Sequence, residues 1–222
     1  MLEFFRALPM FSDVPGSALE TLCRLSQIRH YKKNDVLVEQ ETDTSTVFFV
    51  KSGLIKLVHI DEEGRECIHR MVGEGFVLPG TSLFYHDPLP EFVYSVTDTT
   101  ILEVSQTEFE RWIEPYSTAL IQLAGEMNRR LYHMYEWSHQ LAVSDAEQRV
   151  HYFLEQLVSN FGRMESDGVH INLPVTQTEI AQMVGVRRES LNRILKELQR
   201  KKVLHLRHQA WVVSLDWQTQ IC

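Results

Sequence analysis

The chain has 222 residues, of which 44 % are hydrophobic and 23 % are charged, and its formal net charge is −8. This is the composition of an ordinary folded protein, and the length allows two modest cores joined by a connector. The lack of any run of ~20 apolar residues excludes a membrane-spanning helix, and the N-terminus does not have the pattern of a signal peptide. Three widely spaced cysteines predict a reducing, cytoplasmic location and no metal centre: Cys23, Cys67 and Cys222.

The charge is unevenly distributed along the chain. Residues 1–143 contain 12 Lys and Arg against 21 Asp and Glu, whereas residues 144–222 contain 10 against 9. Within 187–208, eight basic residues accompany only two acidic ones. An acidic body with one basic patch is the electrostatic layout of a protein that docks on DNA with one face. A basic run taken alone is more often a solvated surface.

The first hundred residues change from a helical to a strand-like pattern. Residues 3–27 predict two short helices, interrupted at Pro9 and again near Pro15. From about 29 to 105, short β-prone runs alternate with turn signals. The clearest runs are 36–38, 47–50, 54–58, 67–68, 92–94 and 100–104, with a hairpin tip at 62–65. Many short strands at this spacing predict a closed or rolled antiparallel sheet, which leaves few exposed edges.

A long helix is predicted after the strands. Its residues at alternating spacings of four and three form a seam: Leu120, Ala124, Met127, Leu131, Met134, Ser138 and Leu141. This heptad pattern is typical of two helices that supercoil around each other, so we expect a dimer. The alternative is a single amphipathic helix packed on its own domain.

A domain boundary is predicted at the end of this helix. Ser144 and Asp145 can cap the next helix, and Glu147 stands three residues after Ser144, as in a capping box. We therefore expect three parts: 1–115, 116–143 and 144–222. In the last part, residues 169–173 alternate like a strand.

The segment 176–179 has the sequence TQTE, which is another capping-box signature. Gly185 is predicted to end the short helix that follows, and a second helix is predicted from about 187 to 201. Ala181 is small enough for two helices to approach closely, the glycine permits a tight turn, and Leu191 fills the core between the helices. This spacing predicts a helix-turn-helix.

The second helix separates into two faces. Its inner face contains Leu191, Ile194, Leu195 and Leu198, and its outer face contains Arg188, Glu189, Asn192, Arg193, Lys196 and Arg200. Arginine can bind guanine O6 and N7 with two hydrogen bonds, and a carboxylate can accept from cytosine N4. Arg188 and Glu189 therefore predict a sequence reader, and Arg193, one turn later, can reach a base or a phosphate. The alternative is a solvated helix with surface ion pairs.

The remaining segment predicts a hairpin. Residues 203–206 and 210–214 are strand-like, and 207–209 form a basic tip. This hairpin would be the wing beside the helix-turn-helix, with Trp211 packed in the core rather than stacked on a base.

Over nearly its whole length the chain resembles the cyclic-AMP receptor protein / fumarate-nitrate regulator family. The resemblance is strongest in GVRRESLNRILKEL at 185–198, and it extends to FFVKSG at 48–53 and EEGR at 62–65. Asn34 stands where the family usually has glycine, and Asn tolerates the left-handed backbone. The resemblance implies an α+β fold: an N-terminal antiparallel β-roll of the cyclic-nucleotide-binding type (a double-stranded β-helix), a long dimerisation helix and a C-terminal winged helix-turn-helix.

The resemblance also implies roles for residues. Arg188, Glu189 and Arg193 would read a TGTGA-like half-site. Candidate phosphate or auxiliary contacts are Thr176 and Ser190, by resemblance, and Asn192 and Lys196, by their place on the outer face.

The effector does not follow from the resemblance. Residues 77–84, VLPGTSLF, lack the phosphate-binding cassette of the cyclic-nucleotide branch, and no Lys or Arg occurs from 71 to 110. A buried cyclic phosphate would then lack a charged partner, which argues against cyclic AMP. A small, apolar or aromatic effector between roll and long helix, or no effector at all, is the expectation. The candidate pocket residues are Thr81, Ser82, Met127, Met134 and Tyr135.

Metal or redox sensing would depend on the cysteines and histidines. The iron–sulfur branch needs an N-terminal cysteine cluster that lone Cys23 cannot provide, so no such cluster is expected. Two alternatives stay open: haem ligation by a histidine (His59, His69 or His86) and a redox switch at a cysteine (Cys23 or Cys67).

The sequence thus predicts a DNA-binding transcription regulator and not an enzyme. A two-fold dimer would present its helices to successive major grooves ~34 Å apart, so the operator should be a near-palindrome. An unidentified effector would shift the population of DNA-competent states, and RNA polymerase would be a partner of an activator. The alternative function is a cyclic-nucleotide-binding-like regulatory module acting on a protein partner.

Overall fold

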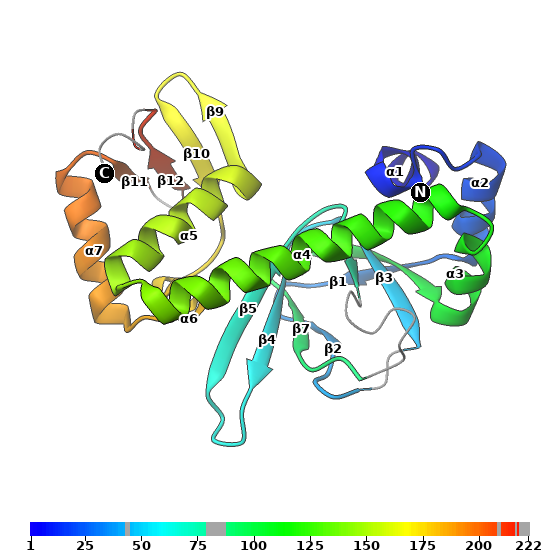
Figure 1. Ribbon diagram of the computed structural model, residues 1–222, viewed down its shortest axis with the longest axis horizontal. Helices are drawn as coiled ribbons and strands as arrows, with labels where there is room; N and C mark the ends of the chain where they lie inside the picture. Colours follow the sequence, from blue (N-terminus) through cyan, green and yellow to red (C-terminus); the bar gives the residue numbers. More distant parts are fainter. Residues whose placement is uncertain (43–44, 79–87, 208–209, 216, 218–222) are drawn as a thin grey trace. The chain divides into compact units, whose positions relative to one another are not determined.

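The computed structural model describes residues 1–42, 45–78, 88–207, 210–215 and 217, except for the side chains of 206 and 207. The chain forms two compact units, Met1–Met134 and Tyr135–Cys222, which are described separately below (Figure 1). None of the helices in these described ranges is long and apolar enough to cross a membrane.

The N-terminal unit is built on two antiparallel four-stranded sheets. One sheet has the order β1 (Gln27–Tyr31), β8 (Thr99–Ser105), β3 (Thr46–Ser52) and β6 (Val77–Leu78). The other has the order β2 (Val36–Val38), β7 (Phe92–Ser95), β4 (Ile55–Ile60) and β5 (Glu66–Val72). Its helical segments are α1 (Leu2–Ala7), the 3-10 turn η1 (Pro9–Phe11), α2 (Gly16–Leu25) and α3 (Gln106–Ile113), followed by α4 (Ser117–Val143), whose last residues belong to the C-terminal unit. The predicted β-roll and its strands are confirmed.

Strand β3 explains how this unit closes. Its run Val47–Val50 is buried on both faces, so it does not alternate between apolar and polar. Phe49 packs on the N-terminal helices, with its ring centroid 5.2 Å from that of Phe5. Phe48 points into a second cluster inside the roll. The strand therefore joins two cores.

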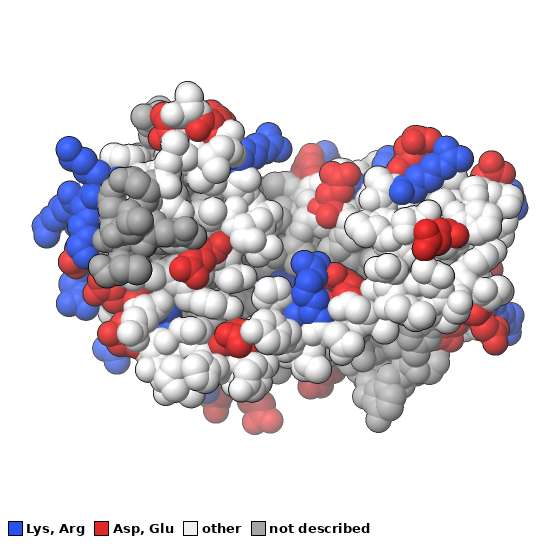
Figure 2. Space-filling model, turned by 45° about the horizontal axis from the view of Figure 1, so that its top comes forward, with Lys and Arg blue, Asp and Glu red and all other residues white. Residues whose placement is uncertain are grey.

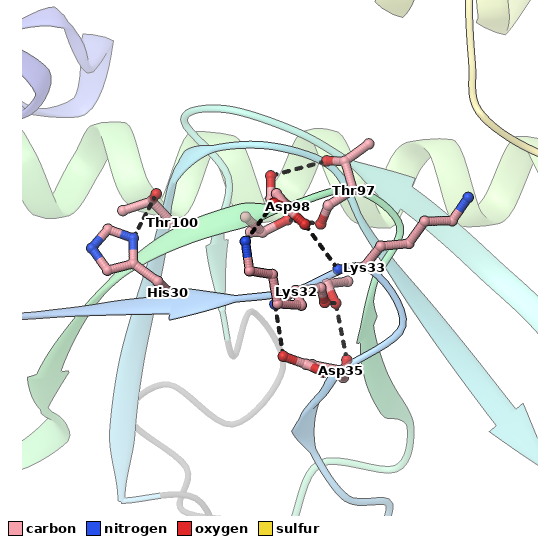
Figure 3. A network of polar contacts seen from close by, with 9 residues as sticks. His30, Lys32, Lys33, Asp35, Thr97, Asp98 and Thr100 are labelled. Carbon is pink, nitrogen blue, oxygen red and sulfur yellow. Dashed lines mark hydrogen bonds and ion pairs between the residues drawn. The ribbon is translucent and has the colours of Figure 1, made fainter.

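Two surface turns of the roll are tied together by polar contacts (Figure 3). Lys32 Nζ lies 2.9 Å from Asp98 Oδ2, and the backbone N–H of Lys33 donates to the same carboxylate. The hydrogen bonds from Lys32 and Lys33 hold the pKa of Asp98 below its usual value. Asn34, in the β1–β2 turn, has φ +70°, so the predicted left-handed turn is confirmed. These contacts join the β1–β2 turn to the β7–β8 turn.

The β4–β5 hairpin ends where the sequence predicted. Asp61 Oδ1 accepts hydrogen bonds from the backbone N–H groups of Glu63 and Arg65, and Gly64 has φ +76°. The local carboxylate therefore satisfies the backbone of the tip, as is typical of Asp at the start of a turn.

The C-terminal unit contains three helices and a four-stranded sheet. The helices are α5 (Ala146–Phe161), α6 (Gln177–Val184) and α7 (Arg188–Arg200). The sheet has the order β11 (Leu204–Arg207), β12 (Ala210–Val213), β10 (Gly168–Asn172) and β9 (Gly162–Glu165). The strand predicted at 169–173 is β10. Its partner β9 was not predicted, because β9 is almost wholly exposed and has no apolar alternation.

The cap of α5 differs by one residue from the prediction. Asp145 is the N-cap, and it forms a capping box with Gln148 rather than Ser144 with Glu147. The Asp145 carboxylate accepts from the backbone N–H of Gln148, and the Gln148 side chain accepts from the backbone N–H of Asp145, both at 2.9 Å. Ser144 Oγ instead bonds Gln140 on the preceding helix. The predicted cap at 144–145 is confirmed at Asp145. Only the predicted pairing of Ser144 with Glu147 was wrong, because two adjacent segments satisfied the same spacing rule.

Candidate functional site

Helices α6 and α7 form the predicted helix-turn-helix. Thr176 Oγ1 accepts from the backbone N–H of Glu179, whose carboxylate accepts in turn from the backbone N–H of Thr176, so the predicted capping box is confirmed. Gly185 ends α6 in the left-handed region, at φ +64°. Ala181 and Leu191 are buried between the helices, as expected from their positions.

Arg149 on α5 holds the turn from outside the motif. Its guanidinium donates to the carbonyl oxygens of Ser144, Val184 and Gly185, at 2.7, 3.3 and 3.2 Å. These carbonyls lie at helix ends, where the backbone lacks partners of its own. The role of Arg149 was not predicted, because nothing in the local spacing of the sequence links α5 to a turn 35 residues later.

Helix α7 has the predicted faces. Its inner residues Leu191, Ile194, Leu195 and Leu198 are each at most 4 % exposed. Arg188, Glu189, Arg193 and Lys196 are exposed, and Ser190 and Asn192 are half-buried. Figure 2 shows Lys and Arg side chains gathered at the left, over the α7 side of this unit.

The exposed basic side chains of α7 are available to a binding partner. Within the described ranges, Arg188, Arg193 and Lys196 make no hydrogen bond or ion pair, whereas Lys201 lies 3.7 Å from Glu197. Thr176, by contrast, already uses its hydroxyl group in the helix cap. The exposed charges at the N-terminal end of α7 can therefore meet DNA without first breaking internal contacts.

The wing is formed by the β11–β12 hairpin, as predicted. Leu204, Val212 and Val213 are buried, and Trp211 packs against the core of the unit. Trp211 is thus half-buried against the core of its unit. Two of the three predicted tip residues, 208–209, lie outside the described residues.

The predicted seam follows one face of α4. Leu120 and Met127 pack partly against the core of the N-terminal unit. The later members Leu131, Met134 and Leu141 are 64 %, 60 % and 49 % exposed. Helix α4 therefore carries large apolar side chains that the chain itself leaves uncovered, and the seam stays a prediction.

The predicted effector pocket is only partly described. Thr81 and Ser82 lie outside the described residues. Met127 packs on the core of the roll unit, whereas Met134 and Tyr135 are exposed on α4. The effector pocket therefore stays a prediction.

Arg130, which lies outside 71–110 in the sequence, packs beside β6, and this contact was not predicted. Arg130 on α4 donates to the carbonyl oxygen of Val77 at 2.9 Å, and its guanidinium carbon lies 3.9 Å from the ring centroid of Phe76. Arg70, at the end of β5, is electrostatically coupled to it. A count of basic residues over 71–110 therefore does not include every arginine that packs on β6.

The haem and redox candidates have ordinary surroundings. The rings of His59 and His69 are stacked, with their centroids 5.9 Å apart. His59 Nδ1 lies 3.1 Å from the Pro90 carbonyl oxygen, and His69 Nδ1 lies 3.2 Å from a carboxylate oxygen of Glu91. Burial raises the pKa of both Cys23 and Cys67, which lowers the fraction of reactive thiolate. His86 and Cys222 lie outside the described residues.

Two family models match the chain in tandem. A cyclic nucleotide-binding domain matches residues 28–116, and a Crp-like helix-turn-helix domain matches residues 148–219. The first covers the β-roll strands, and the second covers the C-terminal unit that contains Arg188, Glu189 and Arg193.

Curated relatives and solved structures agree with these models. The cAMP-activated global transcriptional regulator CRP of Salmonella typhimurium is 28 % identical over 84 % of this chain and 89 % of its own length. A CRP-like cAMP-activated global transcriptional regulator of Mycobacterium tuberculosis is 23 % identical over 96 % of both chains. FixK2 from Bradyrhizobium japonicum superposes with a TM-score of 0.77 over 88 % of this chain and 95 % of its own, at 18 % identity. The chain belongs to the cyclic-AMP receptor protein / fumarate-nitrate regulator family of transcription regulators.

Proposed function

We propose that this protein is a sequence-specific DNA-binding regulator that acts as a homodimer on a near-palindromic operator. The observation that carries the proposal is helix α7. Its apolar face is buried, its N-terminus follows a tight turn at Gly185, and Arg188 and Glu189 stand exposed at that end. An exposed helix of this kind, second in a helix-turn-helix, fits the major groove.

The base-reading roles follow from side-chain chemistry. Arg188 would bind guanine O6 and N7, Glu189 would accept from cytosine N4, and Arg193 would contact a base or phosphate one turn later. The resemblance to the family's recognition segment adds that the half-site should be TGTGA-like. Ser190, Asn192 and Lys196 would make phosphate or auxiliary contacts, and Thr176 would contribute only with the hydroxyl group that also caps α6.

The dimer is proposed from α4. Exposed large apolar side chains on one helix favour burial against a second protein surface, and a parallel copy of the same helix would match their heptad spacing. Two copies would place two α7 helices on one side of DNA, with half-sites one helical turn apart.

Control by an effector completes the proposal. In a two-state regulator, a ligand changes DNA affinity only through its different affinities for the two states. We propose a small effector bound by the N-terminal unit, without an iron–sulfur cluster, and a contact with RNA polymerase if the protein activates transcription. The relatives named above as cAMP-activated keep cyclic AMP among the ligands to be tested.

The test is selection from a random DNA library by the purified full-length protein, at near-physiological salt and with nothing added. Enrichment of a palindrome resembling TGTGA-N6-TCACA is expected. Arg188→Ala should bind DNA without that preference. Arg163→Ala is the matched control, because Arg163 is an exposed arginine on β9 of the same unit. Equal discrimination by wild type and Arg188→Ala would contradict the assignment.

Salt dependence separates this function from a regulatory module that acts on a protein partner. Binding that neutralises several phosphates weakens steeply as salt rises. A folded dimer that binds no DNA at low salt, with or without cell extract, would favour the protein-partner function instead.

A further inference from the structure

Three side chains of metal-binding type converge on the β9–β10 hairpin of the C-terminal unit (Figure 1). Glu165 is the last residue of β9, Asp167 lies in the turn, and His170 is on β10. Each offers one donor atom, a carboxylate oxygen or an imidazole nitrogen, and these atoms all lie within 4.8 Å of one another. One short segment of the chain therefore brings a nitrogen and two oxygen ligands together.

The distances within this group go beyond an ordinary histidine–aspartate pair. His170 Nε2 lies 2.6 Å from Asp167 Oδ1 and 3.6 Å from Glu165 Oε2. An imidazole nitrogen carries at most one proton, so it donates one hydrogen bond, and the Asp167 oxygen is the acceptor within reach. The Glu165 oxygen lies beyond hydrogen-bond distance and still approaches the same nitrogen. The pair alone therefore does not explain why the third group is there.

A divalent ion would bind all three groups. Zinc binds imidazole nitrogen and carboxylate oxygen at about 2.0–2.2 Å, so two ligands of one zinc ion lie about 3.0–3.5 Å apart. The two distances to His170 Nε2 lie on either side of this range. The three side chains are 54 %, 42 % and 22 % exposed for Glu165, Asp167 and His170, so they can make the small adjustment. The ion would take the place of a proton on Nε2.

The backbone under the group is held by the sheet. Strand β10 pairs with β9 on one side and with β12 on the other. Val169 and Ile171 are buried, so His170 between them lies on the opposite, outer face of the strand. Gly168 has φ +146°, and a Cβ there would lie 2.6 Å from the carbonyl oxygen of Val213. The turn therefore lies close against β12, and the ligands project from a rigid base, as a metal site requires.

The local charge also suits a cation. Two carboxylates bring two negative charges, and an imidazole that binds a metal is neutral. Arg163 is the cross-strand partner of His170 and brings one positive charge. Its side chain is exposed, so water and salt screen it. The charge of this group stays negative with Arg163 included, and removal of Arg163 should strengthen the binding of a cation.

We propose that Glu165, Asp167 and His170 bind a divalent transition-metal ion of the zinc type. Imidazole suits zinc and its neighbours, whereas Mg²⁺ and Ca²⁺ prefer oxygen ligands alone. Three protein ligands leave a coordination position open to water or to a group of another molecule. The sequence predicted no metal centre on the basis of its cysteines, and the ligands proposed here are a histidine and two carboxylates. The inference goes beyond the function proposed above and does not depend on it.

The test is calorimetric titration of zinc chloride into the full-length protein, after chelator treatment and in a buffer that does not bind zinc. The zinc affinity should fall at least about tenfold in His170→Gln and in Asp167→Asn, since loss of even a hydrogen-bond partner of a ligand weakens metal binding by about 10–100-fold. Arg163→Gln should bind zinc as tightly as wild type or more tightly. His205→Gln, at an exposed position on β11 of the same sheet, is the matched control and should match wild type.

X-ray absorption by the protein with one equivalent of zinc locates the ion by its ligands. One imidazole nitrogen with oxygen ligands, and no sulfur, is the expected set. A sulfur ligand would place the zinc at a cysteine, and two imidazoles would place it at a pair such as His59 and His69. Either of these sets would overturn the inference.

Two titration results would also overturn it. One is the absence of zinc binding tighter than about 1 mM, and the other is wild-type zinc affinity in both His170→Gln and Asp167→Asn. Thermal unfolding without zinc checks that the variants are folded, and zinc should raise the midpoint of wild type but not that of His170→Gln. Glu165→Gln, which changes the most exposed of the three ligands, is a further variant that should fold normally and bind zinc less tightly.

Discussion

Helix α7 buries four aliphatic side chains and exposes charged ones, whereas helix α4 buries Ala119 and Leu123 and exposes a row of large apolar ones. The exposed apolar residues of α4 are Ile121, Leu131, Tyr132, Met134, Tyr135, Leu141 and Val143. A helix whose apolar face is already buried can bind partners mainly through charge and hydrogen bonds. A helix with an exposed apolar row gains free energy when a second protein surface covers it. The two helices therefore suit two different kinds of partner, a polyanion for α7 and a second protein surface for α4, for which we have proposed another copy of the chain.

The comparison predicts very unequal losses of stability when a leucine is shortened on α7 and on α4. Leu195→Ala on α7 should lower the free energy of unfolding by about 2–5 kcal/mol, since it leaves a cavity in a closed core. Leu131→Ala should change the stability of the dilute monomer by less than about 0.5 kcal/mol, because its side chain is already exposed. Urea unfolding followed by tryptophan fluorescence measures both. Similar losses in the two variants would show that α4 is packed like α7.

A charge on the exposed row tests the role of α4 directly. Leu131→Glu should raise the dimer dissociation constant by about 30-fold or more, the effect expected when a buried anchor worth about 2 kcal/mol is lost. DNA affinity should fall with it, because each half-site alone binds weakly. Sedimentation equilibrium measures the change. Asn128→Glu, which adds the same charge on α4 outside the predicted seam, is the control, and an unchanged profile for Leu131→Glu would refute the seam.

Two substitutions on α7 should separate recognition of the base sequence from electrostatic attraction to the DNA phosphates. Arg188→Ala should lose about 1–3 kcal/mol of discrimination between the operator and a scrambled duplex. Lys196→Ala should weaken binding to both duplexes by a similar factor and reduce the slope of affinity against salt by about one. Fluorescence anisotropy over a salt series gives both quantities. A uniform loss in Arg188→Ala would make Arg188 a phosphate contact.

The C-terminal unit could be predicted closely because its signals are local. The capping box at Thr176, the turn at Gly185 and the faces of α7 each lie within a few residues of the features they define. Where two local signals overlapped, at Ser144 and Asp145, the same rule selected the wrong residue. Local sequence signals therefore predict that a helix is present more accurately than they predict its first residue.

The effector region could not be predicted in this way, because its charges come from distant segments. Arg130 is 53 residues after Val77 and bonds its carbonyl oxygen only when α4 packs on the roll, and Arg70 on β5 acts on Arg130 only through its charge. A count of basic residues over 71–110 misses both. Residues from separate segments are recognised as one site only after the sheet order and the helix position are known.

Replacing a glycine by alanine should change the stability in opposite directions in the turn after α6 and in the long helix α4. Gly185→Ala should destabilise the C-terminal unit by about 1 kcal/mol or more, because φ is +64° and the new Cβ would lie 3.3 Å from Leu141. Gly125→Ala, in the middle of α4 with open space around it, should stabilise by up to about 1 kcal/mol. Thermal unfolding measures both. Stabilisation by Gly185→Ala would mean that the turn does not need a left-handed residue.

The smallest expected effect is on the pH dependence of stability, and it should differ between a half-buried histidine on α5 and an exposed histidine on α4. His151 on α5 is half-buried, its Nε2 has no hydrogen-bond partner within the described ranges, and burial lowers its pKa below 6.5. The unfolded chain therefore takes up this proton first on acidification, and stability is lost as the pH falls from about 6.5 through the lower folded pKa. His151→Gln should flatten the fall in the free energy of unfolding between about pH 7 and 5. His139→Gln, a substitution at an exposed position on α4, should leave this pH dependence unchanged. If the free energy of unfolding depends on pH equally in wild type and His151→Gln, His151 is not a source of the acid sensitivity of the C-terminal unit.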